Sequence, residues 1–243
     1  MRNILITGAS TGIGRATAVE FGKDGANIAL VARRKSELEK TKKLVEEVGG
    51  KAEVYAVDLS SVDAVNSLIN SLKKNWGKVD VIVNIAGIWH GEDQAYSGVS
   101  FSDFSQKVVL DTYAVGLTTP TLLVHALASL MPQKSKVINL SGTFTSGAKG
   151  WLPYYVSKRA LEDFTVGLAE ELKDKDIQVN CVSPSDVATE AYKKYFPKYA
   201  EDVLDPKEVA EYIVHLTSPE FDNTTGKVFT LKKGQGPQEG HHA

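Results

Sequence analysis

Seven short apolar runs, distributed over the whole chain, restrict the possible folds most strongly. They cover residues 3–7, 27–32, 52–57, 79–84, 136–141, 177–183 and 227–231. Most of them are nearly continuous in Val, Ile, Leu and Ala, which is typical of strands buried on both faces of a parallel sheet. The segments between the runs have helical spacing of their apolar residues. The sequence therefore predicts an α/β fold, a doubly wound, seven-stranded parallel sheet flanked by helices.

A single domain is expected over residues 1–234, because no linker, repeat or low-complexity block divides the 243-residue chain. Hydrophobic residues make up 42% of the chain and charged residues 24%, so a full soluble core can form. The aromatic-rich segment at about 189–205 is expected to form a substrate lid within this domain. Residues 235–243 are expected to be a disordered tail.

Charge and cysteine content argue against several classes of function. The net charge of −2 gives no support to nucleic-acid binding, and no apolar run reaches the roughly 18 residues of a membrane span. The one cysteine, Cys181, excludes an intramolecular disulfide and a multi-cysteine metal site. No signal-peptide pattern is present, so a cytoplasmic location is expected. No metal site is predicted, because His90 is interpreted as a solvated loop residue and the tail histidines as a flexible end.

A glycine-rich segment, ITGASTGIG at 6–14, follows the first apolar run and opens the first helical pattern. Gly8, Gly12 and Gly14 let the backbone turn sharply and approach a ligand without interference from a Cβ atom. The free N–H groups at a helix start then favour a pyrophosphate. A purely structural turn is the alternative. Here, however, strand, loop, helix and a second strand follow one another as a dinucleotide-binding Rossmann unit requires.

The end of the second run, LVARRK, indicates which dinucleotide binds. Arg33 and Arg34 follow Ala32, and no carboxylate comes before Glu37. An NAD site has an acidic residue here for the ribose 2′-hydroxyl, whereas an NADP site uses arginine for the 2′-phosphate. Two solvated arginines at a helix start are the alternative, but they do not explain the missing acid. NADP(H) is therefore predicted in preference to NAD(H).

Five motifs occur in order: TGASTGIG (7–14), VDL (57–59), NIAG (84–87), YYVSK (154–158) and PSDVAT (184–189). On these motifs, residues 2–234 resemble the short-chain dehydrogenase/reductase family, in its single-domain branch. The resemblance implies an oxidoreductase that holds its cofactor along these motifs. With Arg33 and Arg34, the candidate cofactor-binding residues are Gly8, Ser10, Thr11, Gly12, Ile13, Gly14, Asp58, Leu59, Asn84, Ala86, Gly87, Tyr154, Lys158, Pro184, Val187 and Thr189. Without the family, Asp58 and Asn84 are explained equally well as strand-end and turn residues.

Two neighbouring tyrosines in LPYYVSKRAL compete for the role of proton donor, since each has a cation four residues later. Tyr154 lies nearly two helical turns before Leu161, the start of the apolar stripe of this helix, so it shares the inward face. Tyr155 instead aligns with Glu162 in a polar set that is interpreted as outward. The Tyr-x-x-x-Lys motif of the family also matches Tyr154 and Lys158. Both arguments select Tyr154.

The chemistry of a phenol explains why a lysine is needed beside it. A free tyrosine titrates at about pH 10, and a nearby ammonium stabilises the phenolate and lowers that pKa. A lower pKa brings the group closer to the range that general acid–base catalysis needs. We therefore expect Tyr154 to exchange a proton with a carbonyl or alcohol substrate while the nicotinamide exchanges a hydride. By family resemblance, Lys158 also contacts the nicotinamide ribose.

The third catalytic candidate is Ser141, which precedes Tyr154 by the thirteen residues usual for the catalytic serine of the family. If the strand is aligned instead, that position falls on Gly142, and Ser141 or Thr143 must supply the hydroxyl by a local shift. A second departure is Tyr113, which occupies the position of an asparagine that links the lysine to solvent in the family. The proton relay must therefore differ or be weakened.

The leading hypothesis is an NADP(H)-dependent oxidoreductase for a small carbonyl or alcohol compound. The alternative is a catalytically impaired NADP-binding sensor or scaffold of the same fold, which Tyr113 and the serine position favour. The intact Tyr154–Lys158 pair favours the enzyme. An epimerase or dehydratase usually needs a larger substrate domain than this length provides. The resemblance also implies a homodimer or homotetramer assembled through the long helices at 103–130 and 155–172.

Overall fold

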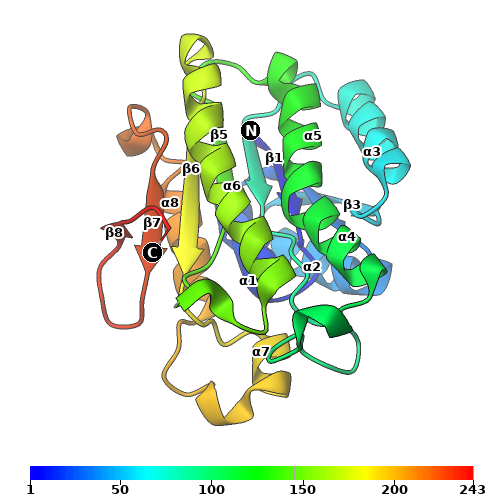
Figure 1. Cartoon of the computed structure of the whole chain (residues 1–243). Helices are drawn as coiled ribbons and strands as arrows, with labels where there is room; N and C mark the ends of the chain where they lie inside the picture. The colour runs from blue at the N-terminus through cyan, green and yellow to red at the C-terminus, as the bar shows by residue number, and fades with distance from the viewer. Residues whose placement is uncertain (145, 243) are drawn as a thin grey trace.

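The computed structural model describes residues 1–144 and 146–242 and contains one twisted sheet between two layers of helices (Figure 1). The strand order is β3-β2-β1-β4-β5-β6-β7-β8. The strands are β1 (Asn3–Thr7), β2 (Asn27–Ala32), β3 (Lys51–Ala56), β4 (Val81–Asn84), β5 (Lys136–Leu140), β6 (Gln178–Pro184), β7 (Val228–Leu231) and β8 (Gln238–Glu239). The first seven pair in parallel, so the predicted doubly wound parallel sheet is confirmed.

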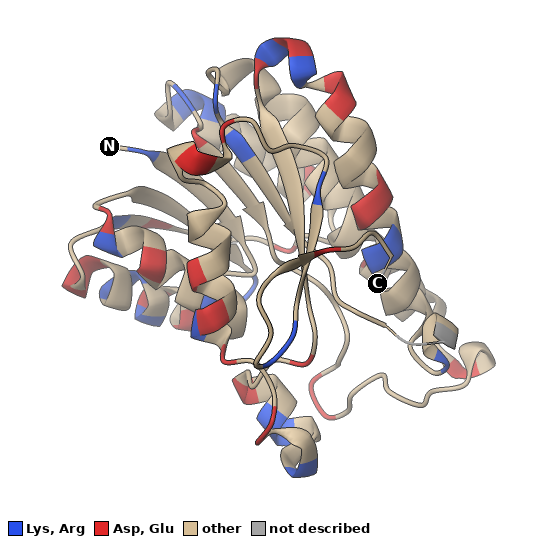
Figure 2. Cartoon of the chain, turned by 90° about the vertical axis from the view of Figure 1, so that its left-hand side faces the viewer, with Lys and Arg blue, Asp and Glu red and all other residues tan. Residues whose placement is uncertain are grey.

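Helices cover both faces of the sheet, as the continuous apolar strands require. The eight α-helices of the described residues are α1 (Gly12–Lys23), α2 (Lys35–Glu47), α3 (Val62–Asn75), α4 (Gln106–Tyr113), α5 (Thr119–Leu127), α6 (Leu152–Glu171), α7 (Glu190–Tyr195) and α8 (Pro206–His215). Apolar residues of α1, α2 and α8 form one core with the sheet, and those of α3, α5 and α6 form the other. Acidic and basic residues are interspersed over the outer helices (Figure 2).

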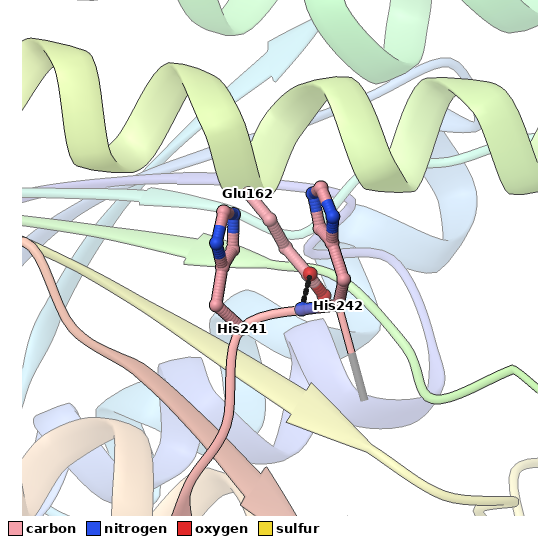
Figure 3. Close-up of side chains that lie close together, drawn as sticks. All are labelled: Glu162, His241 and His242. Carbon is pink, nitrogen blue, oxygen red and sulfur yellow. Dashed lines mark hydrogen bonds between the residues drawn. The ribbon is translucent and has the colours of Figure 1, made fainter.

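The C-terminal segment differs from the prediction of a disordered tail. Gln238 and Glu239 form β8, an eighth strand that pairs antiparallel with β7. The chain then reaches α6, where the His242 N–H donates to the Glu162 carboxylate at 2.8 Å (Figure 3). Backbone pairing along the open edge of β7 gives this segment its order, although its polar sequence has no strand pattern. Ala243 lies outside the described residues.

Glu162 also corrects the expectation of an outward polar face on α6, because its side chain is fully buried. Its carboxylate pairs with Arg159 at 3.1 Å and accepts a hydrogen bond from Ser183 at 3.2 Å. The imidazoles of His241 and His242 lie beside it in the arrangement of a small metal cluster (Figure 3). Both imidazoles also lie against the Asp163 carboxylate, with His241 Nε2 at 3.0 Å and His242 Nε2 at 3.1 Å from its Oδ1.

The long helical segment before β5 contains a π-turn. The segment Gln106–Leu130 has the length and composition of a membrane-spanning helix, but it packs on α3 and α6 as a layer of the α/β domain. Its π-turn, Ala114–Thr118, starts directly after Tyr113. The π-turn therefore forms with tyrosine in the position of the family asparagine. Such π-bulges arise from one extra residue in the helical ladder, and they do not need a particular side chain.

Candidate active site

The phosphate-binding loop lies between β1 and α1, at the carboxyl edge of the parallel strands. Gly8 has a φ of +73°, and a Cβ atom on Gly14 would lie 2.1 Å from the Gly8 carbonyl oxygen. Glycine is thus required at both positions for the loop to close on itself. Ser10, Thr11 and Ile13 fill the rest of the turn. The N-cap residue of α1, Thr11, makes no side-chain capping bond, and no acidic residue occurs in the first turn, so the helix start suits an external anion.

The ends of β2 and β3 carry the residues expected at the adenosine half of the cofactor. Arg33 and Arg34 are exposed directly after β2. The hydrogen bond from the Ser60 N–H lowers the pKa of the Asp58 carboxyl, and the charge of Arg33 lowers it further. Glu37, the first carboxylate after β2, accepts hydrogen bonds from Arg15 and Lys40, each at 2.7 Å.

Asn84, at the end of β4, belongs to a buried polar chain that joins the sheet to α6. Its Nδ2 donates to Asn139 at 2.9 Å, and Asn139 Nδ2 donates to the Thr165 hydroxyl at 2.9 Å. The Asn84 Oδ1 is buried and has no hydrogen-bond partner among the described residues. An unpaired buried acceptor is costly unless a ligand completes it. The unpaired Asn84 oxygen and the uncapped start of α1 are therefore both consistent with a dinucleotide that binds along this edge of the sheet.

Three further candidates for the cofactor groove, Leu59, Ala86 and Gly87, lie close to this edge. Leu59 is buried, and its carbonyl accepts a hydrogen bond from Thr119 at 2.6 Å. Ala86 and Gly87 continue the chain after β4. A Cβ atom on Gly87 would lie 3.3 Å from Lys158 Nζ and 3.4 Å from the Tyr154 ring. The loop after β4 therefore lies close to both members of the predicted catalytic pair.

Tyr154 and Lys158 lie one turn apart on α6, with Lys158 Nζ 5.4 Å from the centre of the Tyr154 ring. Lys158 is only 1% exposed, and its ammonium donates to the Leu140 carbonyl oxygen at 2.6 Å. The Tyr155 ring also contacts Phe144, at 5.2 Å, but its neighbouring cation is Arg159, 5.5 Å from the ring centre, and not Lys158. The structure thus brings Tyr154, and not Tyr155, to the loop after β4.

Burial, and not the ammonium charge, dominates the ionisation of this pair. Desolvation raises the pKa of the Tyr154 phenol above its ordinary value and lowers the pKa of Lys158 to about 8. The expectation that Lys158 lowers the phenol pKa is therefore wrong for the free protein. A phenol in this state stays protonated at neutral pH, which suits a proton donor better than a proton acceptor.

Ser141 is buried at the end of β5, and its hydroxyl donates to the Lys158 carbonyl oxygen at 3.2 Å. This bond fixes the α6 turn that carries Lys158, so the hydroxyl has a positioning role in the free protein. Contact between Ser141 and a substrate oxygen stays a prediction. Thr143, the other candidate, is held by its backbone N–H, which donates to the Pro184 carbonyl at 3.0 Å.

The remaining cofactor candidates lie at the end of β6 and at the start of the segment that the sequence predicts to be a substrate lid (about 189–205), for which the name lid is kept. Pro184 ends that strand, and Val187 forms an isolated bridge with Leu204. The Thr189 side chain caps α7 by accepting from the Tyr192 N–H at 3.1 Å. A Cβ atom on Gly12 would lie 2.9 Å from Thr189 Cγ2. The start of the lid therefore lies directly against the phosphate-binding loop, although 177 residues separate Gly12 from Thr189 in the sequence.

Comparison with known proteins decides the family. The short chain dehydrogenase family model matches residues 2–200. The chain belongs to the short-chain dehydrogenase/reductase family. It is 28% identical over 240 residues to the 3-oxoacyl-[acyl-carrier-protein] reductase FabG of Thermotoga maritima, covering 95% of this chain and 96% of the relative. It is 30% identical to nodulation protein G of Rhizobium sp., with 96% of each chain covered.

Solved structures of the family share the fold over nearly the full length. The promiscuous reductase LugOII, which catalyses a keto-reduction in lugdunomycin biosynthesis, superposes with a TM-score of 0.84 at 28% identity, covering 94% of this chain and 95% of that one. The angucycline C-6 ketoreductase LanV with bound NADP has a TM-score of 0.82 at 25% identity, covering 94% and 93%. This chain is thus an oxidoreductase of the family, with an NADP-bound relative among its neighbours.

An aromatic cluster of this short-chain dehydrogenase, which the motifs did not single out, covers Tyr154. Trp151 lies 6.3 Å from the Tyr154 ring centre, and Phe196 of the lid lies 6.1 Å from Trp151 and 6.2 Å from Trp89. Trp89, Trp151 and Phe196 fall in the three segments at 87–96, 142–153 and 190–204, which the sequence predicts to determine substrate specificity because they follow the carboxyl ends of strands. The rings of Trp89, Trp151 and Phe196 come together only because the loops after β4, β5 and β6 pack against one another.

His90 belongs to the same cluster, so its interpretation as a solvated loop residue is wrong. Its ring lies 4.5 Å from Trp89 and 5.3 Å from Tyr195 of the lid. Desolvation lowers the pKa of this imidazole, which leaves it neutral at pH 7. The Tyr195 hydroxyl donates to the Gly91 and Glu92 carbonyls at 3.1 and 2.8 Å, which fastens the lid to the loop after β4.

Proposed function

We propose that this short-chain dehydrogenase reduces a carbonyl compound with NADPH, and that Tyr154 donates the proton to the substrate oxygen. The observation that carries the proposal is the Tyr154 phenol on α6, which burial keeps protonated and which lies beside Lys158 and close to the loop that follows β4. When bound, the nicotinamide supplies or accepts the hydride. The reverse reaction oxidises an alcohol, with the phenolate form of Tyr154 taking up the proton.

Different residues at the carboxyl ends of the strands would bind different parts of the cofactor. Gly8, Gly12 and Gly14, with the N–H groups of Ser10, Thr11 and Ile13, would hold the pyrophosphate at the start of α1. Arg33 and Arg34 would bind the 2′-phosphate, with Asp58 and Leu59 beside the adenine. Asn84, Ala86 and Gly87 would line the groove, Lys158 would bind the ribose, and Pro184, Val187 and Thr189 would contact the nicotinamide.

The rings around Tyr154 favour a flat, apolar carbonyl substrate. Trp89, Trp151 and Phe196 form an uncharged cluster that reaches Tyr154 through Trp151, so a carbonyl held by the Tyr154 hydroxyl would lie beside these rings. Aromatic surfaces prefer stacked or edge-on aromatic partners, each pair contributing about 0.5–1.5 kcal/mol beyond burial. LanV has also been solved with NADP and rabelomycin, and it is 26% identical with a TM-score of 0.81.

A substrate panel tests the proposed function. We expect NADPH oxidation with 1-tetralone and 9,10-phenanthrenequinone, at a kcat/KM roughly tenfold above that for cyclohexanone. The Phe196→Ala variant should reduce the difference in kcat/KM between the aromatic substrates and cyclohexanone, because it removes the aromatic ring that the lid contributes to the cluster. Tight NADPH binding without oxidation over the whole panel would contradict the proposal and favour the alternative of a sensor or scaffold protein.

The pKa values of the pair predict how the reductive reaction depends on pH. Below about pH 8 the Lys158 ammonium of the free enzyme is charged, and the Tyr154 phenol is protonated throughout the neutral range because its pKa is raised. We expect kcat/KM to be level below pH 8 and to fall above it, since this parameter reports ionisation of the free enzyme. A Lys158→Met variant should lose this inflection, and a wild-type profile that is level to pH 9.5 would contradict the assignment.

The proposal also covers the oligomeric state of the protein and its location in the cell. Leu110 of α4 and Val156 and Val166 of α6 expose apolar side chains on the outer helical layer. We propose that these helices bury this surface in a homodimer or homotetramer. The cytoplasmic location expected from the sequence remains part of the proposal.

A further inference from the structure

The phosphate-binding loop already holds an anion that belongs to the chain itself. The Glu190 Oε2 accepts a hydrogen bond from the Gly12 N–H at 3.2 Å, across 178 residues of sequence. The second oxygen, Oε1, lies 3.6 Å from the guanidinium of Arg15. Glu190 is the first residue of α7, so the carboxylate comes from the lid, which lies beyond the carboxyl edge of the sheet (Figure 1).

The position of this carboxylate coincides with an incomplete helix start. The first turn of α1 contains no acidic residue, and its N-cap residue, Thr11, makes no side-chain bond. Among the other helices that start at this edge, Ser61 caps α3, Ser105 caps α4 and α2 has Glu37 in its first turn, whereas α6, like α1, has neither a side-chain cap nor an acidic residue there. Glu190 therefore supplies from a distance the negative charge that the N-terminal dipole of α1 favours.

The pyrophosphate of a dinucleotide needs the same N–H groups and the same positive end of α1. It cannot share them with a carboxylate, because two anions in hydrogen-bond distance of one N–H repel each other. We propose that Glu190 is an internal competitor of the cofactor, occupying the pyrophosphate position in the free enzyme and leaving it when NADPH binds. This inference rests on the proposed cofactor site, and it adds a lid residue that sets the affinity of that site.

The local structure permits such an exchange. The Glu190 side chain is 64% exposed, so it can turn into solvent without breaking a buried contact. Arg15 does not depend on it, since the guanidinium also pairs with Glu37 at 2.7 Å. The backbone of the lid start stays in place through Thr189, whose side chain packs on Gly12. The carboxylate is therefore free to move while the phosphate-binding loop keeps its shape.

Glu190→Gln tests the competition, because glutamine keeps the size and the acceptor oxygen but removes the charge. By fluorescence titration, the variant should bind NADPH about two- to fivefold more tightly than the wild type, the range for an exposed charge near a helix start. The difference should shrink at high salt. Adenosine 2′-monophosphate, which has no pyrophosphate, should bind both proteins equally. The matched control is Glu201→Gln, since Glu201 is an exposed acid beyond α7 for which the described residues give no ion pair.

The outcomes separate this inference from the proposed function. If the wild type binds NADPH and Glu190→Gln binds it equally or more weakly, the competition is refuted while the cofactor site stands. If Glu201→Gln strengthens binding as much, the effect is general electrostatics, and the specific role of Glu190 is refuted. If neither the wild type nor Glu190→Gln binds NADPH, both proposals fall.

Discussion

Replacing Tyr154 with phenylalanine should lower kcat for carbonyl reduction by about a thousandfold, the middle of the range for losing a general acid. The substitution removes only the hydroxyl, so the ring contacts with Trp151 and Phe144 remain. The melting temperature and the Kd for NADPH should therefore stay close to the wild-type values. Steady-state kinetics with the best ketone of the panel, together with NADPH fluorescence titration, measure both effects.

The neighbouring tyrosine provides a matched control. Tyr155→Phe makes the same chemical change one position along α6, where the ring packs against Phe144 and the Arg159 guanidinium. We expect it to retain nearly full turnover. Full activity in Tyr154→Phe, or an equal loss in both variants, would show that the phenol on the inner face of α6 is not the proton donor.

Removing the two arginines after β2 should have the second-largest effect. In Arg33→Ala/Arg34→Ala we expect the Kd for NADPH to rise roughly 10- to 100-fold, the value of losing charge-assisted hydrogen bonds to a phosphate. The Kd for NADH, which lacks the 2′-phosphate, should change little. Both arginines are exposed, so the loss of binding should occur without loss of stability.

The ratio of the two dissociation constants separates recognition of the phosphate from general electrostatics. Lys51→Ala serves as a control because it removes one positive charge at the start of β3, at the amino ends of the parallel strands and away from the proposed cofactor site. It should leave the preference for NADPH unchanged. A double arginine variant that still prefers NADPH over NADH by the wild-type ratio would mean that another group binds the 2′-phosphate.

The strands and the phosphate-binding loop were predictable from the sequence because each depends on neighbouring residues. Continuous apolar runs can be stable only when they are buried on both faces, and all seven runs became strands with ends shifted by at most two residues. Gly8 and Gly14 are required by the turn that contains them. The separation of Tyr154 from Tyr155 follows from helical periodicity, a local property as well.

Only the tertiary structure decided the features that depend on distant segments. The ionisation of Tyr154 and Lys158 is set by desolvation between β5, α6 and the loop after β4, whereas the sequence indicated only that a cation lies one turn away. Glu162 is buried because Arg159, Ser183 and the C-terminal segment meet around it, although helical periodicity placed it on a polar face. The Glu190 carboxylate reaches Gly12 because the lid folds back over the start of α1. Burial and charge at a site are sums over all surrounding segments, and no single stretch of sequence contains that sum.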